Sequence, residues 1–209
     1  MEIPSDVELQ AIIHRVVSQT LAGKGKQNPR GAASPIAAPI PPLPGPGSVP
    51  APATPVTGSS ARGQVVALGA DHGGYPLKET LKKHLEEKGY SVVDCGTHST
   101  DAVDYPDFAR AVAALVGEGK AWRGIMIDGA GIGSCMAANK IPGVRASMCY
   151  DHATANNARE HNDANVLTLG AGLIGTNLAK EIVDTWLTTP FAGGRHAKRV
   201  EKIMVLEQA

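Results

Sequence analysis

Apolar and polar positions follow two different periods over the last two thirds of the chain. From residue 64 onward, short apolar runs typical of buried strands alternate with longer stretches in which apolar residues recur at helical spacing. The pattern predicts strands at 65–69, 90–95, 123–127, 144–148 and 165–168. It predicts helices near 74–88, 106–117, 133–140, 152–160, 176–188 and 195–207. Alternating strands and helices with short links indicate an α/β fold, a Rossmann-like, doubly wound, five-stranded parallel sheet with helices on both faces.

The first 63 residues have a different texture. Residues 5–8 form a capping box, and apolar residues at helical spacing follow, namely Leu9, Ile12, Ile13, Val16 and Val17. Residues 1–23 are therefore predicted to contain a short amphipathic helix that ends near Gly23. Residues 24–62 hold ten of the fifteen prolines and no acidic residue. Such a segment cannot bury a core, so 24–63 is predicted to be a disordered linker in front of a single domain at 64–209.

Charge and cysteine content exclude several classes of protein. The chain has 20 basic and 20 acidic residues, so net charge favours neither a nucleic-acid partner nor an anionic membrane. No apolar run approaches the roughly 18 residues of a membrane span, and no secretory signal is recognisable, so a cytoplasmic protein is expected. Three cysteines, Cys95, Cys135 and Cys149, lack metal-ligand spacing. Reduced thiols are expected, and neither a metal nor a cofactor.

The candidate chemistry centres on the turn after the third predicted strand. Asp128 ends that strand, and Gly129, Gly131 and Gly133 occupy alternate positions before the next helix. Backbone N–H groups in such a turn can hold a phosphate or a developing oxyanion. A carboxylate beside them is the minimal equipment for removing a proton next to a carbonyl group.

A dinucleotide site is the alternative interpretation of this turn. Asp151 follows Gly129 by 22 residues, near the spacing of a ribose-binding acid. The glycine spacing is G-x-G-x-G rather than G-x-G-x-x-G, however, and the turn belongs to the third βα unit rather than the first, which favours the oxyanion interpretation.

Polar residues also follow the other predicted strands. Asp71 and His72 come after the first strand, and residues 150–152 after the fourth. Ligands of parallel α/β sheets lie beyond the carboxyl ends of the strands. These residues are therefore expected to converge with Asp128.

Five motifs in order resemble the ribose-5-phosphate isomerase B and galactose-6-phosphate isomerase family. They lie at 68–74 (LGADHGG), 103–107 (VDYPD), 129–140 (GAGIGSCMAANK), 159–167 (REHNDANVL) and 193–196 (GGRH). The resemblance covers about 64–205 and leaves the first 63 residues unexplained.

This resemblance implies a metal-free aldose–ketose isomerase that works through a cis-enediolate, with sites shared between two subunits of a homodimer or tetramer. By position, Asp71 and His72 would contact the sugar and its phosphate, Tyr105 would line the pocket, and His161 would open the furanose ring. Asn162 would hold the open chain, and Arg195 and Arg199 would bind phosphate. The enediolate would be stabilised by backbone N–H groups from Gly129 through Gly131, Ile132 and Gly133 to Ser134. The default reaction is the interconversion of ribose 5-phosphate and ribulose 5-phosphate.

Several positions depart from the family's pattern. Most relatives have a cysteine base where this chain has Asp128, and others a glutamate where it has Ser134. Ala130 replaces a hydroxyl residue, and Gly172 replaces a phosphate-contacting arginine. We expect Asp128 to be the enediol base and Cys135 to be a small core residue. The alternatives are an isomerase of a tetrose or hexose phosphate, or a catalytically impaired binding or scaffold component.

The N-terminal helix and linker resemble the encapsulation peptides of bacterial microcompartments. That resemblance implies a shell-protein partner bound through residues 5–21 and a location inside such a compartment. The alternative is that the helix packs on its own domain or self-associates.

Overall fold

The computed structural model describes residues 63–208, so the predicted helix and linker of residues 1–62 lie outside the described residues. Five parallel strands form one sheet in the order β2-β1-β3-β5-β4. The strands are β1 (Val65–Ala70), β2 (Ser91–Asp94), β3 (Arg123–Asp128), β4 (Ala146–Met148) and β5 (Val166–Gly170). The helices are α2 (Tyr75–Glu87), α3 (Tyr105–Gly117), α4 (Ile132–Ala138), α5 (His152–Glu160), α6 (Thr176–Thr188) and α7 (Arg195–Val205), followed by the 3-10 turn η2 (Leu206–Gln208). The predicted fold is confirmed.

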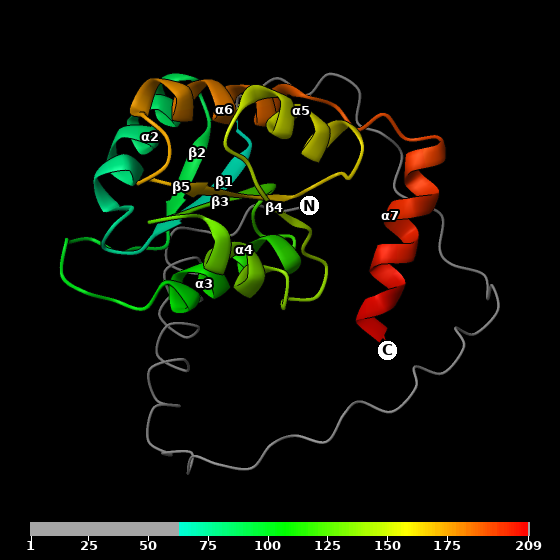
Figure 1. Cartoon of the computed structure of the whole chain (residues 1–209), viewed down its shortest axis with the longest axis horizontal. Helices are drawn as coiled ribbons and strands as arrows, with labels where there is room; N and C mark the ends of the chain where they lie inside the picture. The colour runs from blue at the N-terminus through cyan, green and yellow to red at the C-terminus, as the bar shows by residue number, and fades with distance from the viewer. Residues whose placement is uncertain (1–62, 209) are drawn as a thin grey trace, which may run out of the picture.

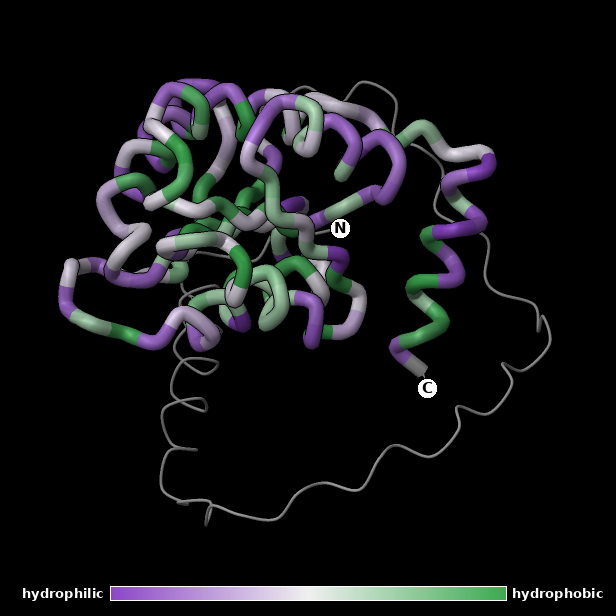
Figure 2. The backbone as a smooth tube through the Cα atoms, in the orientation of Figure 1, coloured by the Kyte–Doolittle hydropathy of each residue, from purple (hydrophilic) through white to green (hydrophobic). Residues whose placement is uncertain are grey.

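The sheet is covered on both faces, as the sequence predicted. Helices α2, α5 and α6 lie on one face, and α3 and α4 lie on the other (Figure 1). The strands serve both layers because successive side chains point to opposite faces: Val66 and Leu68 pack with the first group, and Ala67 packs with the second. Figure 2 shows the hydrophobic positions concentrated in and around the sheet.

The fourth strand is shorter than predicted. The sequence predicted residues 144–148, whereas β4 begins at Ala146. The reason is that Arg145 donates its backbone N–H to the side chain of Asn165, with Nδ2 of Asn165 donating in turn to Gly143 O. Arg145 O still accepts the backbone N–H of Asn165 at 3.0 Å, but the side-chain hydrogen bonds take up Arg145 N and Gly143 O, so residues 143–145 lie outside the strand.

A buried ion pair braces the carboxyl end of the first two strands. Lys78 of α2 is fully buried, and its Nζ lies 2.6 Å from Oδ1 of Asp94 at the end of β2. Burial opposes ionisation of Asp94, but hydrogen bonds from Lys78, from the Gly96 N–H and from Lys82 outweigh it and hold the pKa of Asp94 below its usual value. The adjoining Gly96 O accepts from Ala70 N at 2.7 Å, which fixes the point where Asp71 leaves the sheet.

Helix α7 stands apart from the sheet and its covering helices (Figure 1). None of its residues is buried, although apolar side chains gather in its second half, among them Val200, Ile203 and Met204. A cavity of about 390 Å³ lies between this half, with Leu206, and the segment 139–144. Burial therefore contributes little to holding α7 within one chain.

No helix within residues 63–208 has the length and apolar character needed to cross a membrane.

Candidate active site

Three loops meet at the carboxyl edge of the sheet. Asp71 donates its backbone N–H to Ile127 O at 3.1 Å, which ties the loop after β1 to the end of β3. The loop after β5 is tied to β3 in the same way, because Ala171 N donates to Asp128 O at 2.8 Å and Gly172 N donates to Gly129 O at 3.0 Å. The loops after β1, β3 and β5 thus converge with Asp128 in the middle, whereas residues 150–152 follow the edge strand β4, on the far side of β5.

The side chain of Asp128 is enclosed by its own loop and is only 4% exposed. Oδ1 accepts the N–H of Ala130 at 2.7 Å and that of Gly131. Oδ2 accepts the N–H of Ser134 at 3.1 Å and the Ser134 hydroxyl. The backbone donors that the sequence assigned to an oxyanion thus surround a carboxylate of the chain itself.

Two glycines are required by this geometry. Gly131, the residue before α4, has φ of +78°, in the left-handed region that L side chains rarely adopt. A Cβ at Gly133 would lie 2.5 Å from the ring of Tyr105, so Tyr105 packs directly over the turn. The tyrosine that resemblance placed in the pocket therefore lies against the Asp128 loop.

His72 and Asp71 complete this group of residues. Asp71 is buried and accepts the N–H of Gly74 at 2.8 Å, which closes the turn after β1. His72 is exposed, and its Nδ1 lies 3.2 Å from Val103 O and 3.3 Å from Val103 N. The same segment leads into Tyr105, so His72 and Tyr105 are held together beside the Asp128 loop.

The three thiols are protonated at neutral pH. Burial raises the pKa of Cys135 above its usual value, and the pKa values of Cys95 and Cys149 to about 12 and about 11. Sγ of Cys135 donates to Ala146 O at 3.4 Å, on β4. A thiolate base is therefore disfavoured at all three positions.

The carboxylate that a dinucleotide site would need has another role. Asp151 caps α5, accepting the N–H of Thr154 at 2.7 Å and the Thr154 hydroxyl at 2.8 Å. This reciprocal capping box gives Asp151 a structural role at the start of α5.

A second cluster of predicted residues surrounds the end of α5 and the start of α7. The rings of His161 and His196 stack with centroids 4.2 Å apart, and Ala192 N donates to Glu160 O at 2.9 Å, which brings α7 to this point. Partial desolvation and the nearby His161, Arg195 and Arg199 lower the pKa of His196. The positive charge of this cluster therefore lies on the guanidinium groups of Arg195 and Arg199 rather than on His196.

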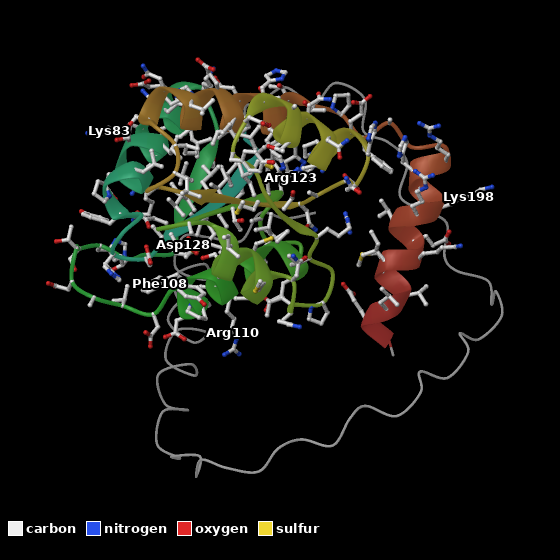
Figure 3. The ribbon with its side chains drawn as sticks, in the orientation of Figure 1. Lys83, Phe108, Arg110, Arg123, Asp128 and Lys198 are labelled. Carbon is white, nitrogen blue, oxygen red and sulfur yellow. The ribbon has the colours of Figure 1, made fainter. Side chains whose placement is uncertain are left out.

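The two clusters lie at opposite edges of the sheet within one chain. Helix α5 starts after the carboxyl end of β4 and ends before the amino end of β5, so His161 is at the amino edge while Asp128 is at the carboxyl edge. Five residues of β5 separate these edges by about 15 Å at ~3.3 Å per residue. Figure 3 shows Asp128 within the body of the domain and Lys198 on α7, well away from it.

The structure thus divides the predicted site residues into two sets. The carboxyl-edge cluster contains Asp71, His72, Tyr105, Asp128, Gly129, Gly131, Ile132, Gly133 and Ser134. The amino-edge cluster contains His161, Asn162, Arg195 and Arg199.

Sequence reasoning missed two features of these clusters. It assigned Ser134 a backbone role only, whereas the Ser134 hydroxyl also contacts Asp128. It assigned nothing to Arg145 and Asp163, which hold the turn that carries His161. Neither feature has a periodic signal, because each joins polar residues across a turn or between distant segments.

Residues 63–208 contain no group of three or more His, Cys, Asp or Glu side chains that could hold a metal ion.

Comparison with known proteins gives a consistent result. The family model described as Ribose/Galactose Isomerase matches residues 66–203. A protein of Escherichia coli named ribose-5-phosphate isomerase B is 46% identical over 143 residues, covering 68% of this chain and 96% of its own length. A protein of Pectobacterium atrosepticum named D-erythrulose-4-phosphate isomerase is 45% identical over 139 residues, covering 66% of this chain and 91% of its own length. The solved structure of Clostridium thermocellum ribose-5-phosphate isomerase B superposes with a TM-score of 0.69 at 50% identity, covering 69% of this chain and 98% of that one.

Proposed function

Because this chain belongs to the ribose/galactose isomerase family and is a sugar-phosphate isomerase of the ribose-5-phosphate isomerase B type, we propose that Asp128 is the base of its aldose–ketose isomerisation. The supporting observation is the position of the Asp128 carboxylate, seated among N–H donors and beside Asp71, His72 and Tyr105.

The proposed reaction moves one proton between adjacent carbons. Asp128 removes the proton from the carbon next to the carbonyl of the open-chain sugar, and the carbonyl oxygen becomes the enediolate O⁻. The protonated Asp128 then returns that proton to the carbon that was the carbonyl. The hydroxyl of the other carbon gives its proton to the enediolate oxygen and becomes the new carbonyl, which completes the 1,2-transfer.

The N–H groups of the Asp128 loop are proposed to stabilise first the Asp128 carboxylate and then the enediolate. In the structure the N–H groups of Ala130, Gly131 and Ser134 stabilise the Asp128 carboxylate. We propose that the Asp128 side chain turns out of the loop toward the bound sugar. The same N–H groups then donate hydrogen bonds to the enediolate oxygen. Carboxylate and enediolate carry the same charge, so the loop needs no rearrangement between the two states.

The amino-edge cluster is proposed to act in the site of a second subunit. His161 would open the sugar ring, Asn162 would hold the open chain, and Arg195 and Arg199 would bind the phosphate dianion. One chain separates these residues from Asp128 by the length of the sheet, so a complete site requires a homodimer or a tetramer built from dimers.

Exposed apolar side chains near the Asp128 loop support this assembly. Ile132 and Met136 lie one turn apart on α4 and are 49% and 64% exposed, and Leu173 after β5 is 61% exposed. A second copy that brings its α7 to this edge would cover these residues and the unburied apolar half of α7.

Ribose 5-phosphate is the default substrate, with a tetrose phosphate as the second candidate. Gly172 stands where relatives have an arginine that contacts the phosphate. The chain therefore lacks one charge-assisted hydrogen bond to the phosphate, a contact worth about 1.5–3 kcal/mol. The Escherichia coli and Pectobacterium proteins, named for a pentose and a tetrose phosphate, are 46% and 45% identical to this chain, so overall similarity favours neither.

An NMR assay of the purified chain with tetrose, pentose and hexose phosphates tests the proposal. We expect exchange of solvent deuterium into the carbon next to the carbonyl, together with net aldose–ketose conversion, for at least one substrate. Binding without conversion for every sugar would instead identify a catalytically impaired binding or scaffold component.

We also propose that residues 5–21 attach the enzyme to a shell protein of a bacterial microcompartment. The apolar stripe of Leu9, Ile12, Ile13, Val16 and Val17 and the proline-rich segment after it support this. A tether of 39 residues, at about 3.1 Å per residue, could reach on the order of 100 Å from the domain.

Deleting residues 1–62 is expected to leave the isomerase domain folded and active but to abolish its co-purification with shell proteins. A finer test is Val16→Glu, which puts a charge in the apolar stripe, with Ser18→Glu on the polar face as the matched control. Undiminished co-purification of the deletion variant would refute the targeting role and favour packing of the helix on its own domain.

A further inference from the structure

The turn between α5 and β5 places His161 and Asn162 at the amino edge of the sheet. Its next residue, Asp163, has φ of +45°, the only positive φ among non-glycine residues within 63–208. That backbone conformation is unfavourable for a residue with a Cβ, so other contacts must hold it.

Two arginines supply those contacts. Arg145 donates from Nε to Asp163 O at 3.0 Å, and from Nη2 to the same oxygen at 2.8 Å and to Oδ2 at 3.2 Å. Arg159 of α5 donates from Nη1 to Oδ1 of Asp163 at 2.8 Å. Arg159 is only 3% exposed, with its guanidinium 5.7 Å from the ring of buried Trp186, so the turn is anchored in the core.

Arg145 also reaches the last helix. Its Nη1 lies 3.2 Å from Sδ of Met204 in α7. The same loop holds the end of that helix, because Gly143 N lies 3.0 Å from both carboxylate oxygens of Glu207. Since α7 has no buried residue, these contacts are a large part of what fixes its place within one chain.

We infer that Arg145 is a positioning residue that sets the His161–Asn162 turn and the Arg195–Arg199 helix face in register, and so pre-organises the phosphate half of the site. This rests on the proposed function for the identity of the ligand. Arg145 contacts no substrate in this scheme. Its fork of N–H groups joins the two elements that do, and a planar fork loses less freedom on bonding than separate side chains would.

The effect of losing Arg145 follows from pre-organisation. With the fork removed, α7 and the turn sample several relative orientations, and sugar-phosphate binding must select one of them. The weakening should appear mainly in KM, because bound sugar phosphate itself selects the orientation that places His161, and the Asp128 loop that carries out the proton transfer lies at the other edge of the same chain and keeps its geometry.

The experiment compares Arg145→Ala and Arg145→Lys with Lys83→Ala, an exposed α2 residue far from α7 in Figure 3. We expect KM to rise about tenfold in Arg145→Ala, because binding must then select one of several orientations, with kcat within about threefold of the parent. Arg145→Lys should stay impaired because an ammonium cannot form the fork, and Lys83→Ala should match the parent.

Amide hydrogen exchange of the same proteins gives a readout that does not depend on turnover. Exchange should quicken in 161–164 and 195–205 of Arg145→Ala and stay unchanged in β1 and β3. An unchanged KM, or a proportional fall in kcat and in exchange protection across the whole domain, would overturn the positioning role. A parent chain that converts no sugar phosphate would defeat the proposed function instead, and local exchange would still decide whether Arg145 holds the two elements together.

Discussion

Asp128→Asn is expected to lower kcat by about two to four orders of magnitude, the usual contribution of a positioned general base. The lone pair of the amide nitrogen is delocalised into the carbonyl and the amide oxygen is a very weak base, so the first step has no acceptor for the substrate's proton. The assay is conversion of the best sugar phosphate followed by NMR, with solvent-deuterium exchange at the carbon next to the carbonyl as a direct measure of proton removal.

The Asp128→Asn substitution keeps the shape of the side chain, but the hydrogen bonds around Asp128 make it a more severe change than that similarity suggests. Both carboxylate oxygens face donors, Oδ1 the N–H groups of Ala130 and Gly131, and Oδ2 the N–H and hydroxyl of Ser134. Either orientation of the amide points an NH₂ at N–H donors. Calorimetric binding of the sugar phosphate must therefore accompany the kinetic measurement, to distinguish lost chemistry from a disrupted loop.

Two further variants sharpen the interpretation. Ser134→Ala removes one of four donors but keeps the carboxylate, so a loss of about tenfold or less is expected, in line with one hydrogen bond. Asp184→Asn, which changes an α6 carboxylate bound by His84 and Lys88, should leave kcat unaltered. An Asp128→Asn enzyme as active as the Asp184→Asn control would rule out Asp128 as the base.

The sheet was predictable because burial on both faces leaves a strong signal. Runs such as Ile125 to Ile127 are fully buried in the structure, and only a central strand of a covered parallel sheet needs such a run. Strand β4 was overestimated because Val144 is buried and apolar like a strand residue, whereas Arg145 beside it is held by side chains that no periodicity reveals, and β2 is also shorter than predicted, at Ser91–Asp94 rather than 90–95.

The arrangement of the candidate site was less predictable than its membership. Motif resemblance named Asp128 and His161 together, but only the path of α5 between β4 and β5 shows that one chain keeps them at opposite edges. The enclosure of Asp128 by its own loop was equally hidden, because carboxylate and oxyanion satisfy the same donors and the glycine spacing is the same for both. The sequence alone could not give the distance between the segments that carry Asp128 and His161.

Mixing two inactive variants is expected to restore activity if each site draws on two subunits. Asp128→Asn damages the carboxyl-edge cluster and His161→Asn the amino-edge cluster. In a two-fold dimer of one chain of each kind, one site then carries both changes and the other carries none. Each mixed dimer has one intact site of two, so isolated mixed dimers should recover about half of the parent activity, and an unsorted random mixture, half of whose dimers are mixed, about a quarter. Each variant alone should stay below about 1% if it removes an acid–base group.

The matched control pairs Asp128→Asn with Asp71→Asn, since both residues lie in the carboxyl-edge cluster. Every site of that mixed dimer contains one of the two changes, so no activity should return. The measurement is coexpression with two different affinity tags, isolation of doubly tagged protein and assay of conversion. Doubly tagged dimers of the Asp128→Asn and His161→Asn chains that remain inactive would mean that the amino-edge cluster does not complete the Asp128 site. Recovery with the Asp128→Asn and His161→Asn pair, but not with the control pair, would place His161, Arg195 and Arg199 of one subunit beside Asp128 of the other. In that arrangement neither α7 nor the Asp128 loop can act until the two subunits have assembled.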